Sequence, residues 1–358
     1  MTTLSAASRP YRVLVVGASY GLLPASRIAV GGHHVTVVGR TEEITAIAAS
    51  GVVIAFSEER HLRPPMGDDG LSLRTPATVE PADFDLVLLA VQEPQVSSPD
   101  LRRLLEKIGD KLPIASIMNM PPPPYLARIS TLPPSVGGGA YGCPEAWAPL
   151  PSERMTLASP DPQAFRPDPA CPGHLRVTLA SNFKFAPFAR PEDQAILERI
   201  TRDASRAAQA WGRPPVHLLA RSSTFVPLSK WPMLVTGNCR CVQDEGLPLS
   251  IRDAVHADPV KSRILFEAVY ASLSSIGAPA SALVPFDAYL EAAQNLTRPS
   301  SLAMGLAKGA EGVERVDMLV LELLRATKAD PEAIDMMAAI NSRIEKSLAE
   351  NRRKTAAP

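Results

Sequence analysis

The sequence predicts an α/β domain built on a parallel, doubly wound sheet, followed by an all-α domain. Three observations support this prediction. Short β-branched apolar runs alternate with helical patterns up to residue 118, as in βαβ units. A glycine-containing turn follows the first of these runs. After residue 191, apolar residues recur at three- and four-residue spacing, which is typical of amphipathic helices. We expect domains at residues 1–190 and 191–350 and a disordered tail at residues 351–358.

Length and composition narrow the class of protein. A chain of 358 residues suits about two domains. The 37 basic and 37 acidic side chains cancel, which argues against a nucleic-acid platform. No apolar run approaches the roughly 18 residues of a membrane span, and residues 1–10 lack the apolar segment of a secretory signal. We therefore expect a cytoplasmic protein that binds a small molecule rather than nucleic acid or membrane.

The first domain begins with apolar runs that predict buried strands, separated by segments with helical spacing. The expected strands are residues 12–16, 35–38, 52–56, 84–91 and 113–118, and the expected helices are residues 22–30, 42–50 and 100–108. Four prolines at 121–124 stop regular structure after the last strand. A segment rich in Pro, Gly and Ser follows at 132–173, and residues 175–179 predict a strand that closes the domain.

The second domain is predicted to consist of helices alone. Apolar spacing indicates helices at residues 192–211, 222–246, 259–276, 286–296 and 331–348, the second of them bent at Pro232. Prolines at 259, 285 and 331 stand at helix starts, where a missing N–H costs little.

The first strand-to-helix turn is the best candidate for a cofactor site. It reads Gly17-Ala18-Ser19-Tyr20-Gly21, one residue shorter than the G-x-G-x-x-G fingerprint of Rossmann-type domains. In that fold, glycine lets the backbone approach the pyrophosphate, and the helix N-terminus supplies free N–H groups. Glycines in such turns can also serve packing alone, but the position after the first strand favours a dinucleotide.

Arg40 follows the second strand, 23 residues after Gly17. An acidic residue near this position binds the ribose hydroxyl of NAD, whereas an arginine accommodates the 2′-phosphate of NADP. The sequence therefore favours NADP(H). An exposed arginine without a ligand is the alternative.

The chain resembles the ketopantoate reductase (2-dehydropantoate 2-reductase) family, which is related to 6-phosphogluconate dehydrogenases. The resemblance rests on VLVVGASYG, GHHVTVVGR, DLVLLAVQEPQV, IMNM and RPSSLAMGL. It implies a Rossmann-type domain, a helical domain that often dimerises, and NADPH-dependent reduction of a 2-oxo acid to a 2-hydroxy acid.

The family motifs carry over unevenly in the first domain. Val91 and Gln92 stand where the family chain passes the cofactor, usually with a lysine in place of Gln92. Asn119 matches an asparagine that helps to hold substrate and nicotinamide, although Met120 and four prolines replace the usual glycine-rich continuation. A turn-forming role is the alternative for Asn119.

In the helical domain, the resemblance implies a lysine as general acid and an asparagine on the same helix face. Met233 occupies the usual lysine position, so Lys230 is the nearest candidate, with Asn238 eight residues later. A solvated lysine at a helix start is the alternative reading.

Two further residues match substrate-binding positions of the family. Ser301 corresponds to the serine that binds the substrate carboxylate, although a serine pair here also suits a helix N-cap. Glu314 corresponds to a substrate-positioning glutamate if one residue is inserted, since an ungapped match reaches Val313. A charge on a helix surface is the alternative for Glu314.

The expected function is thus an NADPH-dependent 2-oxo acid reductase acting on a small carboxylate. Two other classes stay open: a C=N reductase of the imine or opine type, and a degenerate NADP-binding protein with a sensing or assembly role. Neither the C-x-C pair at Cys239 and Cys241 nor the six histidines have the spacing of a metal site, so we expect none.

Overall fold

The computed structural model describes residues 9–209 and 216–356 of the chain. The chain forms two compact units, each assembled from separate segments. The first unit contains the residues up to Val91, Ser98–Met118 and Ala146–Ser222; the second contains Gln92–Ser97, Asn119–Glu145 and the residues from Ser223 onward. Most of the segment 1–10, which is expected to lack a secretory signal, and the predicted helix end at Trp211 lie outside the described residues.

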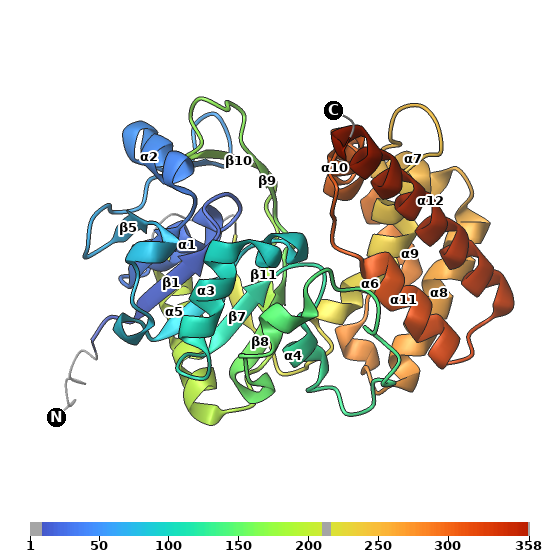
Figure 1. Ribbon diagram of the computed structural model, residues 1–358, viewed down its shortest axis with the longest axis horizontal. Coiled ribbons are helices and arrows are strands. Elements are labelled where there is room, and N and C mark those ends of the chain that lie inside the picture. Colours follow the sequence, from blue (N-terminus) through green and yellow to red (C-terminus); the bar gives the residue numbers. More distant parts are fainter. Residues whose placement is uncertain (1–8, 210–215, 357–358) are drawn as a thin grey trace. The chain divides into compact units, whose positions relative to one another are not determined.

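The first unit is organised around an eight-stranded sheet (Figure 1). Its strands are β1 (Arg12–Val16), β2 (His34–Val38), β5 (Leu71–Arg74), β6 (Leu86–Leu89), β7 (Ile114–Ile117), β8 (Met155–Ser159), β11 (Phe183–Phe185) and β12 (Leu218–Ala220). They lie in the order β12-β11-β8-β7-β6-β1-β2-β5. All neighbours from β5 to β8 are parallel, whereas β11 runs antiparallel to β8.

The six parallel strands have the strand order 3-2-1-4-5-6 of a Rossmann sheet when numbered along the chain. The order reverses between β1 and β6, which pair in register from Val13 opposite Leu86 to Val16 opposite Leu89. Ligands of such sheets bind at the carboxyl ends of the strands beside this reversal. The predicted α/β sheet is confirmed, and its switch point places the glycine turn after β1.

Four helices of the first unit agree closely with the expected ranges, although the last of them is expected in the helical domain. They are α1 (Leu22–Val30), α2 (Thr41–Ser50), α3 (Pro99–Ile108) and α5 (Pro191–Gln209). The helices α1 and α5 pack closely because Gly31 has no side chain: a Cβ there would lie 2.9 Å from the backbone nitrogen of Ala204. Gly32, with φ of +86°, turns the chain toward β2.

A second, four-stranded sheet corrects two sequence predictions. Its strands are β4 (His61–Leu62), β3 (Val53–Ala55), β10 (His174–Leu179) and β9 (Gln163–Phe165), in that order. The predicted strands at 52–56 and 175–179 therefore pair with each other here, β3 parallel to β10, and not in the main sheet. The third parallel strand of the main sheet is β5, which the sequence analysis misses because its four residues, Leu-Ser-Leu-Arg, lack a continuous apolar run.

The second unit is helical, as predicted. Its longer helices are α7 (Ile251–His256), α8 (Pro259–Ser275), α9 (Phe286–Ala293), α10 (Ser301–Ala307), α11 (Val316–Ala326) and α12 (Pro331–Ala356), and a one-turn helix α4 (Pro123–Leu126) starts within the proline run. Proline is tolerated there because it occupies the first helical turn. No helix within residues 9–209 and 216–356 has the length and apolar character needed to cross a membrane.

The helix α12 continues to Ala356, through most of the segment for which the sequence predicts disorder. Asn351 accounts for the difference. Its buried side-chain amide donates hydrogen bonds to the carbonyl oxygens of Leu306 and Ala310, both at 2.9 Å. These bonds hold the last turns of α12 against α10, which sequence periodicity does not reveal. Residues 357 and 358 lie outside the described residues.

The predicted bent helix at residues 222–246 is wrong in detail. The segment consists of a 3₁₀ turn (Pro227–Lys230), α6 (Trp231–Met233), a π turn (Leu234–Asn238) and a second 3₁₀ turn (Cys239–Cys241). Tyr289 explains the π turn. Its hydroxyl donates to the carbonyl of Met233 at 3.1 Å, and a Cβ on Gly237 would lie only 2.1 Å from that hydroxyl. Tyr289 thus takes the acceptor that Gly237 would use in a regular α-helix.

Candidate functional site

The glycine turn after β1 is shaped by close backbone approaches. Gly17 has φ of +113°, and a Cβ there would lie 2.4 Å from the carbonyl oxygen of Ala90 and 3.1 Å from Cγ1 of Val91. A Cβ on Gly21 would lie 2.9 Å from Cγ1 of Val15. Both glycines are therefore required by geometry, and the turn touches the chain that leaves β6. This arrangement brings together Gly17, Gly21 and Val91, three residues of the predicted cofactor site.

The turn presents unused hydrogen-bond donors. In the described part of the chain, the N–H groups of residues 18–21 donate to no protein acceptor, and the side chain of Ser19 is exposed. They stand at the N-terminus of α1, where the helix dipole favours negative charge. Free N–H groups at a helix N-terminus bind the phosphate oxygens of a pyrophosphate. The residues present therefore fit a dinucleotide cofactor.

Arg40 lies where the sequence places it, directly after β2 and at the N-cap of α2. Its side chain is exposed, and among the described residues it makes no side-chain hydrogen bond or ion pair. Gly39 brings this strand end close to the glycine turn, since a Cβ there would lie 2.7 Å from Cβ of Ala18. A cation thus stands at the carboxyl end of β2, free to meet a phosphate.

Gln92, which the sequence analysis assigns to the cofactor, is exposed and belongs to the second unit. Its backbone N–H donates to Oε1 of Gln95 at 2.9 Å. Gln92 does not carry the positive charge that a lysine gives the family at this position, so the cofactor-binding role of Gln92 stays a prediction.

In the second unit, two predicted residues that are far apart in sequence lie together. The side-chain amide of Asn119 donates to Oε2 of Glu314 at 3.3 Å, and the backbone N–H of Met120 donates to Oε1 of Glu314 at 3.5 Å. Glu314 is buried and Asn119 is half-buried. The alternative of an exposed helix-surface charge for Glu314 is therefore wrong, whereas its substrate-positioning role stays a prediction.

Burial changes the protonation of Glu314. Removal from water raises its pKa to about 7, and the negative charge of Glu93 acts in the same direction, while hydrogen bonds from Met120 and Asn119 oppose the shift. Burial also raises the pKa of Glu93, which accepts a hydrogen bond from the N–H of Gly142 at 3.0 Å. Near neutral pH, Glu314 can therefore either hold or release a proton.

A buried charge network follows Glu314 in the chain. Arg315 forms a two-pronged ion pair with Asp317, with N–O distances of 3.0 and 2.8 Å, and also pairs with Glu345. Asn341 donates to Asp317 at 2.9 Å. Paired buried charges of this kind fix local geometry. They anchor the start of α11 and so hold the backbone of Glu314 in place.

The remaining predicted residues lie near the π turn and the start of α10. The hydroxyl of Ser300 donates to the carbonyl of Asn238 at 2.8 Å and accepts from the N–H of Ala303 at 3.1 Å. Ser300 is thus the N-cap of α10, and Ser301 is exposed in the first helical position. Lys230 is half-buried at the end of a 3₁₀ turn. Sequence reasoning did not single out Ser300 as the residue that joins these segments.

The cysteines do not form a metal site. Cys239 and Cys241 are buried free thiols, and burial raises the pKa of both. Across the part of the chain that the structure describes, no group of three or more His, Cys, Asp or Glu side chains is arranged to hold a metal ion.

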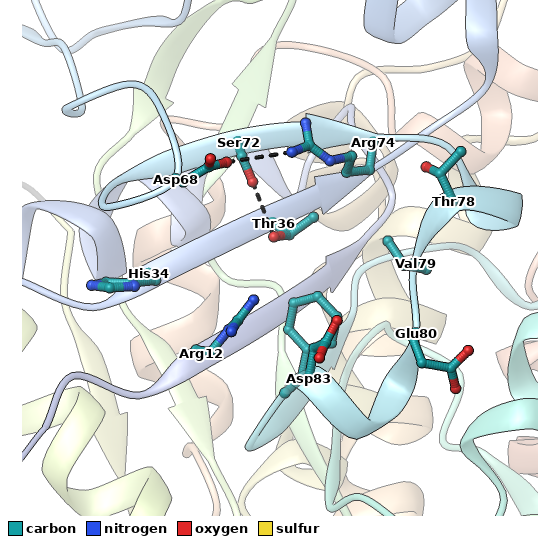
Figure 2. Close-up of a pocket in the computed structure, with 11 residues that line it drawn as sticks. Arg12, His34, Thr36, Asp68, Ser72, Arg74, Thr78, Val79, Glu80 and Asp83 are labelled. Carbon is teal, nitrogen blue, oxygen red and sulfur yellow. Dashed lines mark hydrogen bonds and ion pairs between the residues drawn. The ribbon is translucent and has the colours of Figure 1, made fainter.

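A polar pocket of about 190 Å³ lies on the β1–β2–β5 side of the main sheet. Figure 2 shows the side chains that line it. Its basic side chains are already engaged: Arg74 pairs with Asp68 at 3.3 Å, and the guanidinium of Arg12 stands 5.9 Å from the ring centre of Phe84. None of the predicted cofactor or substrate residues lines this pocket. It is therefore separate from the glycine turn and from Glu314.

Comparison with known proteins agrees with this geometry. Residues 13–120, from β1 to Met120, match the family model described as ketopantoate reductase PanE/ApbA. The resemblance to the ketopantoate reductase family is confirmed. The matched region contains the glycine turn, Arg40 and Asn119. A search of curated proteins finds no match for the chain.

Solved structures extend the likeness over nearly the whole chain. A 2-dehydropantoate 2-reductase from Methylococcus capsulatus is 15% identical with a TM-score of 0.68, over 95% of this chain and 97% of that one. A ketopantoate reductase from Ralstonia eutropha JMP134 is 15% identical with a TM-score of 0.66, over 95% and 99%. D-mandelate dehydrogenase with NADH and anilino(oxo)acetate is 12% identical with a TM-score of 0.64, over 95% and 99%. All three are oxidoreductases, and at these identities the likeness shows the shared fold.

Proposed function

We propose that this protein is an NADPH-dependent reductase that converts the carbonyl of a 2-oxo acid to a 2-hydroxy acid. The observation that carries the proposal is the glycine turn at the switch point of a 3-2-1-4-5-6 sheet, with unused N–H donors at residues 18–21. The match of residues 13–120 to ketopantoate reductases supports the same reaction class. The bound cofactor would supply the hydride.

The first unit would hold the cofactor. The turn from Gly17 to Gly21 would bind the pyrophosphate, and Arg40 would bind the 2′-phosphate of NADP in the two-pronged manner that a guanidinium allows. Val91, which touches the turn, would line the path of the cofactor. An exposed arginine at the end of β2, in place of an acidic residue, is what supports NADP over NAD.

The second unit would hold the substrate. Asn119 and Glu314 form a polar pair whose carboxyl group can carry a proton near neutral pH. Such a pair suits the orientation of a carbonyl or hydroxyl group. Ser301, exposed at the start of α10, would bind the substrate carboxylate. Asn238 would orient the substrate, because its backbone is tied to the same helix start through Ser300.

The reduced oxygen also requires a proton donor. Lys230 is the candidate that the family resemblance supports, displaced by three residues from Met233. A protonated lysine would stabilise the growing negative charge on oxygen and then donate its proton. Glu314 is a second group able to donate at neutral pH.

The decisive experiment mixes the purified protein with NADPH and a panel of 2-oxo acids and follows the loss of NADPH absorbance. Turnover with a 2-oxo acid alone is the expected result. Turnover that appears only when an amine is added would instead favour the C=N reductase. Saturable NADPH binding without oxidation under any condition would favour the non-catalytic alternative, and failure to bind either nicotinamide coenzyme in calorimetry would overturn the proposal.

A further inference from the structure

A strand of the small sheet brings a second arginine to the glycine turn. Residues 160–166 lead into and out of β9, and Figure 1 shows β9 and β10 in the first unit together with α2. The Nη2 of Arg166 donates to the carbonyl of Ala18 at 3.0 Å, and the hydroxyl of Tyr20 donates to the carbonyl of Pro162 at 2.6 Å. This segment is thus bonded to two residues of the turn.

Arg166 also pairs with an acidic residue of the helix that follows β2. Its Nη2 lies 2.6 Å from Oε1 of Glu43, and the two side chains are 24% and 14% exposed. Glu43 belongs to the first turn of α2, one turn after Arg40. The other carboxylate oxygen lies 3.3 Å from where a Cβ on Gly39 would be. A carboxylate therefore stands beside the carboxyl end of β2, where Rossmann domains discriminate between the two ribose groups.

The position of Glu43 creates an electrostatic conflict. A free carboxylate at this point accepts hydrogen bonds from ribose hydroxyls and repels a 2′-phosphate. Arg40 alone would only offset that charge. With Arg166 paired to Glu43, the three side chains together carry one net positive charge, in a setting where partial burial weakens screening.

We propose that Arg166 is a specificity-determining residue for the cofactor, which acts by neutralising Glu43 and so allows a nucleoside 2′-phosphate to bind beside Arg40. This inference rests on the proposed function and adds to it a residue outside the matched region 13–120. Arg166 reaches the site only because β9 belongs to the small sheet.

The competing explanation is that Arg166 merely holds the turn through Ala18. The two roles predict different selectivity. Loss of turn geometry would weaken NADP⁺ and NAD⁺ equally, because both share the pyrophosphate. Exposure of the Glu43 charge would weaken NADP⁺ alone, because only NADP⁺ carries the extra phosphate.

The test measures the dissociation constants of NADP⁺ and NAD⁺ by calorimetry for the full chain and for Arg166→Gln, Glu43→Gln and the double variant. We expect Arg166→Gln to weaken NADP⁺ by about tenfold or more and NAD⁺ by less than about threefold. The double variant should regain NADP⁺ binding to within about threefold of the original protein, since the repelling charge is gone. Arg176→Gln, on the exposed face of β10, is the matched control and should change neither constant.

Glu43→Gln gives an independent reading if Arg166→Gln does not fold. It should strengthen NADP⁺ relative to NAD⁺, because Arg166 is then unpaired beside the phosphate. Equal weakening of both coenzymes by Arg166→Gln without rescue in the double variant, or no gain in selectivity from Glu43→Gln, would overturn the inference while leaving the proposed function intact. Absence of binding of either coenzyme to the original protein would instead overturn the proposed function, and this inference with it.

Discussion

Replacing Glu314 with glutamine removes a buried carboxyl group whose ionisation the fold opposes. In the folded protein its pKa is about 7, against an ordinary value of 4.5, because burial penalises the charged form. The unfolded chain therefore releases this proton near pH 4.5, whereas the folded protein keeps it until about pH 7. Between these values the unfolded state binds fewer protons, so the free energy of unfolding falls as pH rises.

The size of this effect follows from the shift. A difference of about 2.5 pKa units, at 1.36 kcal/mol per unit, corresponds to about 3 kcal/mol of stability lost between pH 4.5 and pH 8. Glutamine cannot ionise, so Glu314→Gln should lack this loss. The hydrogen bonds of the glutamine side chain to Asn119 and Met120 differ from those of Glu314, and they change the free energy of unfolding by an amount that does not depend on pH. The change in the stability difference with pH, rather than its absolute value, therefore reports the buried carboxyl.

The assay is urea-induced unfolding of the original protein and Glu314→Gln at pH 5, 6, 7 and 8. The variant should gain about 2.5 kcal/mol relative to the original protein between pH 5 and pH 8, because a small part of the loss has already occurred by pH 5. Glu311→Gln, an exposed glutamate three residues earlier, is the control and should show no such trend. A stability difference between the original protein and Glu314→Gln that stays constant from pH 5 to pH 8 would refute the burial of an ionisable group at this position.

Three other substitutions, one of them with a control variant, test Arg40, the glycine turn and Lys230. Arg40→Asp should reverse the preference for NADP⁺ over NAD⁺ in calorimetry, and an unchanged preference would remove Arg40 from the site. Gly17→Ala should abolish coenzyme binding, since a Cβ would lie 2.4 Å from the carbonyl oxygen of Ala90. The control Gly32→Ala also has a positive φ but nothing within 4 Å, so it should lower the free energy of unfolding in urea by only about 1 kcal/mol and leave coenzyme binding unchanged. Equal coenzyme affinity in the two variants would contradict this reasoning. Lys230→Ala should lower turnover with a 2-oxo acid by roughly 10²–10⁴-fold if Lys230 is the general acid, and a loss below threefold would assign protonation elsewhere.

Local sequence patterns predict the parallel strands well where burial is continuous. The runs that became β1, β6 and β7 are buried on both faces almost throughout, as is typical of the inner strands of a parallel sheet. The strand β5 has no such run, and its place beside β2 is decided by the pairing of Val35 with Leu71 and the following residues. The strands β3 and β10 are apolar enough to be predicted, but nothing local indicates which sheet they join.

The candidate site divides in the same way. The glycine turn and Arg40 could be located from sequence because each depends on residues close to it in the chain. Glu314 could be placed only through an inserted residue, and its burial beside Asn119 depends on a contact across 195 positions. The π turn before Asn238 could not be predicted, since it depends on the hydroxyl of Tyr289, 56 positions from its acceptor at Met233.

By itself, the sequence determined the class of the fold, the position of the glycine turn and the basic residue after β2, because strand burial, turn conformation and charge are properties of short segments. The tertiary structure alone decided that Glu314 is a buried acid with a raised pKa and that Arg166 pairs with Glu43 in the first turn of α2. Desolvation and ion pairing depend on which groups surround a side chain, and those neighbours come from distant parts of the chain.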